Sequence, residues 1–138
     1  MHIKLAFAAA AALALALPTG AAAQSAGTGI VSLYHAAPGH QVALLKWLAE
    51  QERIAVAAGQ PTAQIYAHTD GDSWDYLMIA PVTTAEQDAA FEAAAKKLGL
   101  TSGPRAGIEL RKHIASHTDT FVRGPMTASQ MLANLGEK

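Results

Sequence analysis

The sequence contains no cysteine and no run of like charges. Without cysteine, a disulfide framework and a lipid attached through cysteine are both excluded. The 11 acidic residues nearly balance the 10 basic ones, so the formal net charge is −1. A chain so nearly neutral has no electrostatic feature that would attract nucleic acid or an anionic membrane surface. We therefore expect neither as a partner.

No apolar run in the sequence approaches the roughly 20 residues that a membrane-spanning helix needs. The apolar run at 5–17 follows a basic start at Lys4 and precedes the small residues 21–23. This is the pattern of a secretory signal peptide, so residues 1–23 are expected to be cut off near Ala23. The remaining chain has the size of one domain. We expect a periplasmic or secreted protein, with no membrane association after cleavage.

Two alternating runs, 64–68 and 74–79, flank the sequence Asp70-Gly71-Asp72. Asp-Gly between such runs predicts a β-hairpin. Before it, a leader at 24–29, a strand at 30–35 and a helix at 38–58 are predicted. After it, Thr83 and Glu86 have the spacing of a capping box that opens a helix ending near residue 98. A loop at 101–106, a strand at 108–116 and a tail helix at 127–135 complete the prediction.

The predicted order is strand, helix, strand, strand, helix, strand. Ala37-Pro38 recurs as Ala80-Pro81 at the same offset that separates Pro61 from Pro104, which indicates two βαβ halves. Two such halves give an α+β, ferredoxin-like βαββαβ domain: a four-stranded antiparallel sheet with both helices on one face. We assign this domain to residues 30–123 and a helical tail to residues 124–138.

Alternation divides each predicted strand between two faces of the sheet. The face under the helices is predicted to hold the aliphatic residues Val31, Leu33, Ile65, Ala67, Leu77, Ile79, Leu110 and Ile114. The opposite face then holds Ser32, Tyr34, Gln64, Tyr66, His68, Trp74, Tyr76, Met78, Glu109, Arg111 and His113. An aromatic surface of that size requires a cover, and a second copy of the sheet would supply one. A homodimer is therefore predicted.

In element order and face chemistry, residues 30–121 resemble the dimeric α/β-barrel superfamily, which includes antibiotic-biosynthesis-monooxygenase-like and stress-responsive barrel proteins. The resemblance rests on no diagnostic motif. It implies two ferredoxin-like sheets paired around a cavity, and functions from cofactor-independent oxygenases and isomerases to haem-handling enzymes and proteins without known activity. Fold alone does not choose among these functions.

Several residues of the predicted open face have side chains suited to ligand chemistry. His68 and His113 are candidate catalytic proton acceptors, because the unperturbed pKa of histidine is about 6.5. The candidate ligand-binding residues are Tyr34, Tyr66, Trp74, Tyr76 and Arg111, with Arg111 as an anion clamp. The alternative is that the same residues only fill a dimer interface, where Tyr, Trp and Arg are common.

The sequence predicts no metal site. His113 and His117 have the spacing of a helical metal pair, but in a strand the two would lie about 13 Å apart. Asp70, Asp72 and Asp75 lack the further ligands of a calcium loop and are typical of a turn. His-Thr-Asp occurs at both 68–70 and 117–119, without the nucleophile elbow of a serine hydrolase.

We therefore expect a homodimer that binds a small aromatic or carbonyl-bearing ligand, with a cofactor-independent oxygenase or isomerase as the enzymatic version of this hypothesis. The second hypothesis is a non-catalytic stress or interaction protein whose open sheet serves dimerisation alone. The third is haem binding through His68, His113 or His117.

Overall fold

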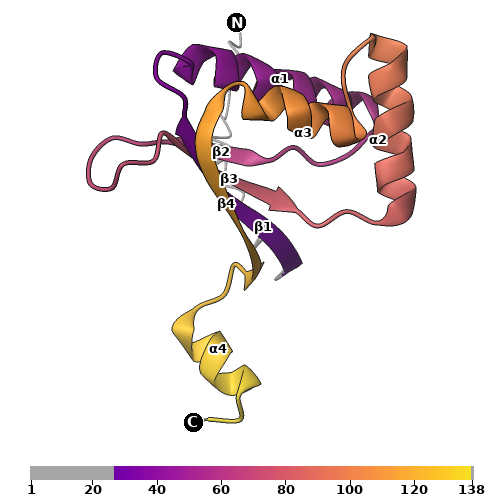
Figure 1. Ribbon diagram of the computed structural model, residues 1–138. Helices are drawn as coiled ribbons and strands as arrows, with labels where there is room; N and C mark the ends of the chain where they lie inside the picture. The colour runs from indigo at the N-terminus through magenta and orange to yellow at the C-terminus, as the bar shows by residue number, and fades with distance from the viewer. Residues whose placement is uncertain (1–26, 138) are drawn as a thin grey trace, which may run out of the picture.

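The computed structural model describes residues 27–137. The predicted signal peptide and residues 24–26 of the predicted leader lie outside the described residues. The elements follow the order β1 (Gly27–Ala36), α1 (Gln41–Ala57), β2 (Gln64–Ala67), β3 (Tyr76–Pro81), α2 (Ala85–Leu98), α3 (Gly103–Arg111), β4 (Ile114–Gly124) and α4 (Ala128–Asn134) (Figure 1). Among the described helices, none has the length and apolar character needed to cross a membrane.

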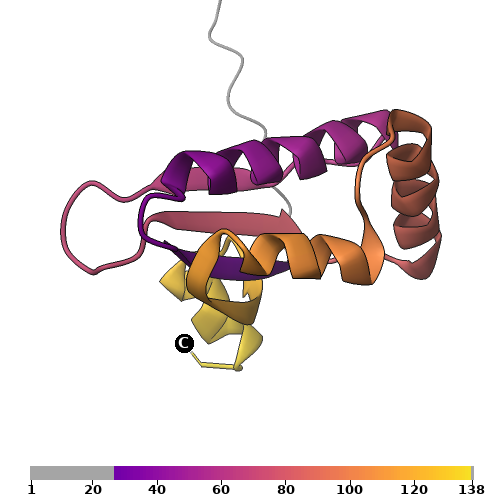
Figure 2. The same ribbon diagram turned by 45° about the horizontal axis from the view of Figure 1, so that its top comes forward.

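The four strands form one antiparallel sheet in the order β2-β3-β1-β4. This is the predicted ferredoxin-like arrangement, and the fold prediction is confirmed. The sheet of the single chain is open and does not close into a barrel. Helix α1 runs along one side of the sheet, α3 lies on the same side, and α2 packs across the far end of α1 (Figure 2).

The predicted loop at 101–106 and strand at 108–116 are wrong over most of their length. Residues 103–111 form α3, which has a proline in its first turn, as helices tolerate. The fourth strand begins only at Ile114 and continues to Gly124. The sequence does not distinguish helix from strand here, because Ile108, Leu110 and Ile114 fit a period of two as well as a helical face.

Two smaller predictions also need correction. Gly27, Thr28 and Gly29 belong to β1 and not to a flexible leader. The capping box of α2 is made by Thr84 and Gln87, one residue later than predicted, and Gly99 ends the helix at a φ of 66°. The tail helix is confirmed, with its predicted capping box at Thr127 and Gln130.

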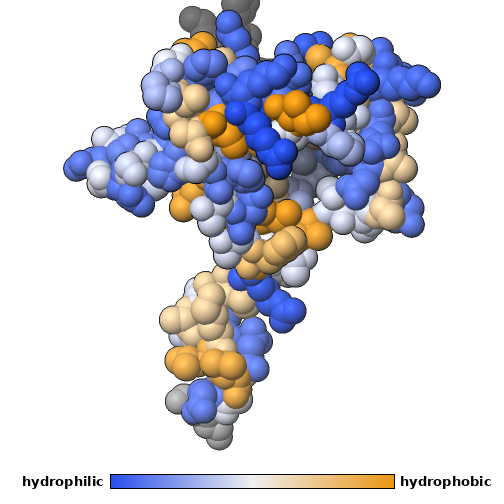
Figure 3. Space-filling model, viewed as in Figure 1, coloured by the Kyte–Doolittle hydropathy of each residue, from blue (hydrophilic) through white to orange (hydrophobic). Residues whose placement is uncertain are grey.

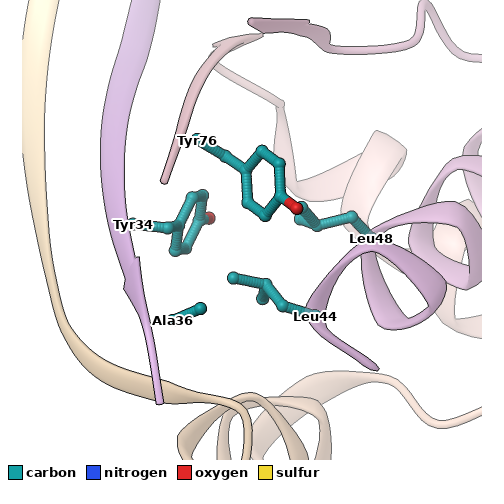
Figure 4. Close-up of a cluster of buried hydrophobic side chains, with 5 residues drawn as sticks. All are labelled: Tyr34, Ala36, Leu44, Leu48 and Tyr76. Atoms are coloured by element: carbon teal, nitrogen blue, oxygen red, sulfur yellow. The ribbon is translucent and has the colours of Figure 1, made fainter. Parts of the chain in front are cut away.

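The predicted faces of β1 and β3 are exchanged in the structure. Tyr34 of β1 and Tyr76 of β3 are register partners, and both point toward Leu44 and Leu48 of α1 (Figure 4). Ala36 completes this buried cluster. The tyrosines therefore lie beneath the helices and not on the open face. A second cluster joins Ile54 of α1 to Ala94 and Ala95 of α2 and lies beyond the end of the sheet.

The opposite side of the sheet, which we call the open face, includes Val31, Leu33, Tyr66, Leu77, Ile79 and Val122, together with the polar residues Gln64, Thr118 and Thr120. Leu33 and Val31 are the register partners of Leu77 and Ile79, so four aliphatic side chains form a continuous block. Helices α1 and α3 lie on the other side of the sheet (Figure 2). Dimerisation remains a prediction, but the surface that would mediate it is aliphatic and not aromatic.

Candidate functional site

The helix side of the sheet is built from side chains that the register places in rows across the four strands. One row runs Ala67, Tyr76, Tyr34 and His117; the next runs Ile65, Met78, Ser32 and Asp119; a third includes Ala80, Ile30 and Phe121. Helix α1 covers the first row with Leu44 and Leu48. In the second row, the side chains change from apolar on β2 and β3 to polar on β1 and β4, whereas Ala80, Ile30 and Phe121 of the third row are all apolar.

A pocket of about 290 Å³ opens over the apolar half of these rows. It lies between the C-terminal half of α1, the start of α2 and strands β2 and β3, each of which contributes lining residues. The space between the two buried clusters is thus left unfilled. On this side of the molecule the surface is hollowed below α3 and beside α2 (Figure 3). We call this space the helix-side pocket.

The walls of the helix-side pocket are mainly apolar. Leu48 of α1, Ile65 and Met78 of the sheet and Phe91 of α2 contribute the largest apolar side chains. The polar groups of its lining come from the surrounding elements: Gln51 and Glu52 of α1, Gln60 after α1, Thr83 before α2, and Asp88 of α2. Apolar walls with a few polar groups are typical of sites for small organic ligands, which measure about 300–1,000 Å³.

Beside the pocket, β1 and β4 contribute four residues that we call the Asp119 cluster: Ser32, Tyr34, His117 and Asp119. The Ser32 hydroxyl donates a hydrogen bond to Asp119 Oδ1 over 2.7 Å, and His117 Nε2 lies 3.3 Å from Asp119 Oδ2. The rings of Tyr34 and His117 are stacked, with centroids 6.0 Å apart. Asp119 thus binds one neighbour by a hydrogen bond and faces another that carries a positive charge when protonated.

The Tyr34 hydroxyl is held in its neutral form. Burial raises the pKa of Tyr34, and the charge of Asp119 raises that pKa further, although the hydroxyl of Ser32 acts in the opposite direction. The backbone around Tyr34 is fixed by Asp75, whose N–H donates to the Tyr34 carbonyl over 2.8 Å. The Asp75 carboxylate also accepts a 2.7 Å hydrogen bond from Ala36 N–H. Asp75 is therefore a structural residue at the end of β1.

The structure does not gather the predicted site residues at one place. Tyr34 and Tyr76 belong to the buried cluster under α1, whereas Tyr66 lies on the open face. His68 and Trp74 contact each other at the base of the hairpin loop, with ring centroids 5.1 Å apart. Arg111 ends α3, and its side chain is exposed. His113 lies in the turn before β4, where its ring is 5.8 Å from that of His40.

The prediction of one shared face for these residues is wrong, because Glu109, Arg111 and His113 are not in a strand and because β1 and β3 present their other faces. The roles assigned to the individual residues remain predictions. The sequence analysis did not identify the hydrogen bond between Ser32 and Asp119. The signal that could have found the site was His117-Thr118-Asp119, because residues i and i+2 of a strand share a face.

Within residues 27–137, no group of three or more His, Asp or Glu side chains could hold a metal ion. Asp70 and Asp72 accept hydrogen bonds from the N–H groups of Gly71 and Ser73, as turn residues do. None of the three histidines considered for haem lines the helix-side pocket.

No family model and no curated protein matches the chain. Among solved structures, it is similar to a dimeric protein of unknown function with a ferredoxin-like fold from Bacteroides fragilis, at 12% identity over 74% of this chain and 99% of that one, with a TM-score of 0.47. It is also similar to SnoaB, a cofactor-independent oxygenase from Streptomyces nogalater, at 19% identity over 73% and 95% of the two chains and a TM-score of 0.43.

A third similar structure is a protein from Chloroflexus aurantiacus that is named after the antibiotic biosynthesis monooxygenases. It shares 23% identity over 72% of this chain and 96% of that one, with a TM-score of 0.40. The three structures are of the kinds that the sequence resemblance names. At these identities, residue roles are not transferred from any of them.

Proposed function

We propose that this protein binds a small organic ligand, aromatic or carbonyl-bearing, in the helix-side pocket. The observation that carries the proposal is the unfilled space of about 290 Å³ between the two buried clusters, with Met78 and Ile65 as its floor. Its size suits a compact molecule of one or two rings. Gln51 has an amide group that can donate a hydrogen bond to a carbonyl oxygen, and Phe91 offers an aromatic ring for stacking.

We also propose that two copies of the chain associate through the open face, as the sequence prediction of a homodimer requires. What supports this is the aliphatic block of Val31, Leu33, Leu77 and Ile79, which is continuous across β1 and β3. Contiguous exposed apolar surface marks interaction sites. This arrangement places the partner on one side of the sheet and the ligand on the other.

The test of ligand binding uses 4-hydroxyacetophenone, an aromatic ketone of one ring, in titration calorimetry. We expect saturable binding to the wild-type protein and at least tenfold weaker binding to an Ala80→Trp variant, because Ala80 lines the pocket and a larger side chain there occupies it. The matched control is Ala89→Trp on the exposed surface of α2, which should bind as the wild type does. Absence of saturable binding, or equal affinities in all three proteins, would contradict the proposal.

A second candidate is a non-catalytic interaction protein in which only the open face has a function. The same aliphatic block favours this candidate, because it requires a partner whether or not a ligand is bound. The two candidates differ in the Ala80→Trp experiment. Dimerisation without any saturable ligand binding favours the interaction protein.

A further inference from the structure

We propose that the helix-side pocket prefers aromatic ligands that carry a protonated amino group, and that Glu52 and Asp88 determine this preference. The inference rests on the proposed ligand binding and narrows the class of ligand. Among the described residues that line the pocket, Glu52 and Asp88 are the charged ones, and none is a lysine, arginine or histidine. A ligand in this pocket therefore meets negative charge from the lining and no positive charge.

Neither carboxylate is neutralised by a basic side chain of the described chain. The ion pairs found within residues 27–137 lie at α3 and β4 and include neither Glu52 nor Asp88. Arg53 follows Glu52 in the sequence, but consecutive side chains of a helix point in directions about 100° apart. Arg53 accordingly does not line the pocket. The negative charge of the lining is thus available to a ligand.

The Asp88 carboxylate is held in place by a neighbour in the lining. The Thr83 hydroxyl donates a hydrogen bond to Asp88 Oδ1 over 2.6 Å, and Thr83 itself lines the pocket. This bond leaves Asp88 Oδ2 to accept a hydrogen bond from a ligand. An ammonium group supplies N–H donors together with positive charge, and hydrogen bonds between charged partners are stronger than those between neutral ones.

The N-terminus of α2 does not favour an anionic ligand instead, although helix N-termini often bind anions. The Thr84 side chain accepts a hydrogen bond from Gln87 N–H, and the Gln87 side chain accepts one from Thr84 N–H. Asp88 N–H donates to the Thr84 carbonyl. These donors are used within the chain, and Glu86 and Asp88 already place negative charge at this end of the helix.

Each carboxylate has a large apolar side chain one helical turn away in the lining. Leu48 and Glu52 are at positions i and i+4 of α1. Asp88 and Phe91 are at positions i and i+3 of α2. Such residues share one side of a helix, with Cβ atoms about 5–6 Å apart. An arylethylamine, in which two carbons join ring and nitrogen, can therefore place its ring against the apolar walls and its ammonium group beside a carboxylate.

The test compares three phenols that differ only at the end of a two-carbon side chain. Tyramine ends in an ammonium group, 4-propylphenol in a methyl group and 3-(4-hydroxyphenyl)propionate in a carboxylate. In titration calorimetry at low salt, we expect tyramine to bind about tenfold more tightly than the propionate, a modest factor because both carboxylates of the lining are exposed. Salt screens exposed charges, so this preference should shrink in about 0.5 M sodium chloride.

The decisive variant combines Glu52→Gln with Asp88→Asn. It should bind 4-propylphenol as the wild type does, while the preference for tyramine over the propionate falls to less than about twofold. The amide oxygen at position 88 can still accept the hydrogen bond from Thr83. The matched control combines Glu50→Gln with Glu86→Gln, which removes the same charge from exposed positions of the same two helices outside the lining. The control should keep the preference, and melting temperatures check that both variants are folded.

The outcomes separate this inference from the proposal on which it rests. Saturable binding of 4-propylphenol without a preference for tyramine overturns the inference and leaves the pocket in place. A preference that survives in the Glu52→Gln and Asp88→Asn variant, or that is lost equally in the control, also overturns it, because the two carboxylates are then not its cause. Absence of binding of all three phenols and of 4-hydroxyacetophenone overturns both proposals.

Discussion

The two sides of the sheet differ in kind. On the helix side, Tyr34 and Ser32 of β1 are almost fully buried, and the Ser32 hydroxyl is hydrogen-bonded to Asp119. On the open face, the adjacent residues Val31 and Leu33 are aliphatic and only partly covered by the described chain. A side chain as polar as serine is buried, while side chains as apolar as leucine and isoleucine remain partly exposed.

This difference indicates which kind of partner each side of the sheet can contact. A polar group that is buried in a sheet and hydrogen-bonded there has a fixed position. Such an exception to apolar burial is typical of a functional site. Aliphatic groups that reach the surface as a block are typical of an interface. Under the two proposals made above, the same sheet contributes to a ligand site on one face and to a subunit contact on the other. Each prediction below tests one part of this division.

The largest expected effect is the loss of stability when a buried side chain of α1 is truncated. Leu44 is completely buried against Tyr34 and Tyr76, so Leu44→Ala should lower the free energy of unfolding by about 2–5 kcal/mol. Leu45 is the neighbouring residue of the same type and is 39% exposed, so Leu45→Ala should cost about 1 kcal/mol or less. Urea denaturation of both variants measures the difference. Equal losses would mean that the helix side is not the core.

The next effect concerns the open face. Ile79→Glu would place an unpaired charge in the proposed subunit contact, and we expect the dimer dissociation constant to rise at least tenfold, which corresponds to about 1.4 kcal/mol. Val42→Glu is the control, because Val42 is an exposed aliphatic residue of α1 away from this face. Sedimentation equilibrium measures both. A monomeric wild type, or a dimer unaffected by Ile79→Glu, would show that the open face is not the interface.

A smaller effect is expected at high pH. Because burial raises the pKa of Tyr34 above the ordinary value of 10.0, the folded state binds the phenolic proton more tightly than the unfolded state. The stability that this provides is complete below pH 10 and is lost as the pH rises toward the folded pKa. Tyr34→Phe removes this contribution, so its unfolding free energy should fall less between pH 9 and 11. Identical pH profiles would indicate that the Tyr34 hydroxyl is solvated.

The smallest effect is expected for the tail. Helix α4 stands apart from the rest of the chain, and its apolar residues Met131, Leu132 and Leu135 are exposed (Figure 3). Deletion of residues 126–138 should change the unfolding free energy by no more than about 0.5 kcal/mol. A thermal melt at a fixed protein concentration checks this. A loss of about 1 kcal/mol or more would mean that the tail contributes to the core or to the subunit contact.

Element order and sheet topology could be predicted from the sequence because the hairpin at Asp70-Gly71 and the prolines around both helices are local signals. The position of the fourth strand could not be predicted from the sequence. Its residues His117-Thr118-Asp119-Thr120 are polar on both faces, as suits an exposed edge strand, and so lack the apolar alternation that identifies a strand. The more apolar residues 108–114 fit that alternation better and therefore lead the sequence-based prediction to the wrong segment.

A different reason explains why the two faces of β1 could not be assigned from the sequence. Val31 and Leu33 are more hydrophobic than Ser32 and Tyr34, so a rule based on hydrophobicity places the aliphatic pair in the core. Both faces of this strand are in fact suited to burial, and a pattern of two apolar faces does not determine which one meets the helices. The assignment of His117, Asp119 and Ser32 to one site depended on this choice and on the start of β4.

The most direct test of the division between the two sides is methyl NMR of the wild-type protein titrated with 4-hydroxyacetophenone. The account predicts saturable shifts of the Ile65 and Met78 methyl signals, which line the helix-side pocket, with the signals of Leu33 and Ile79 unchanged. Shifts confined to Leu33 and Ile79 would place the ligand on the open face and contradict the account.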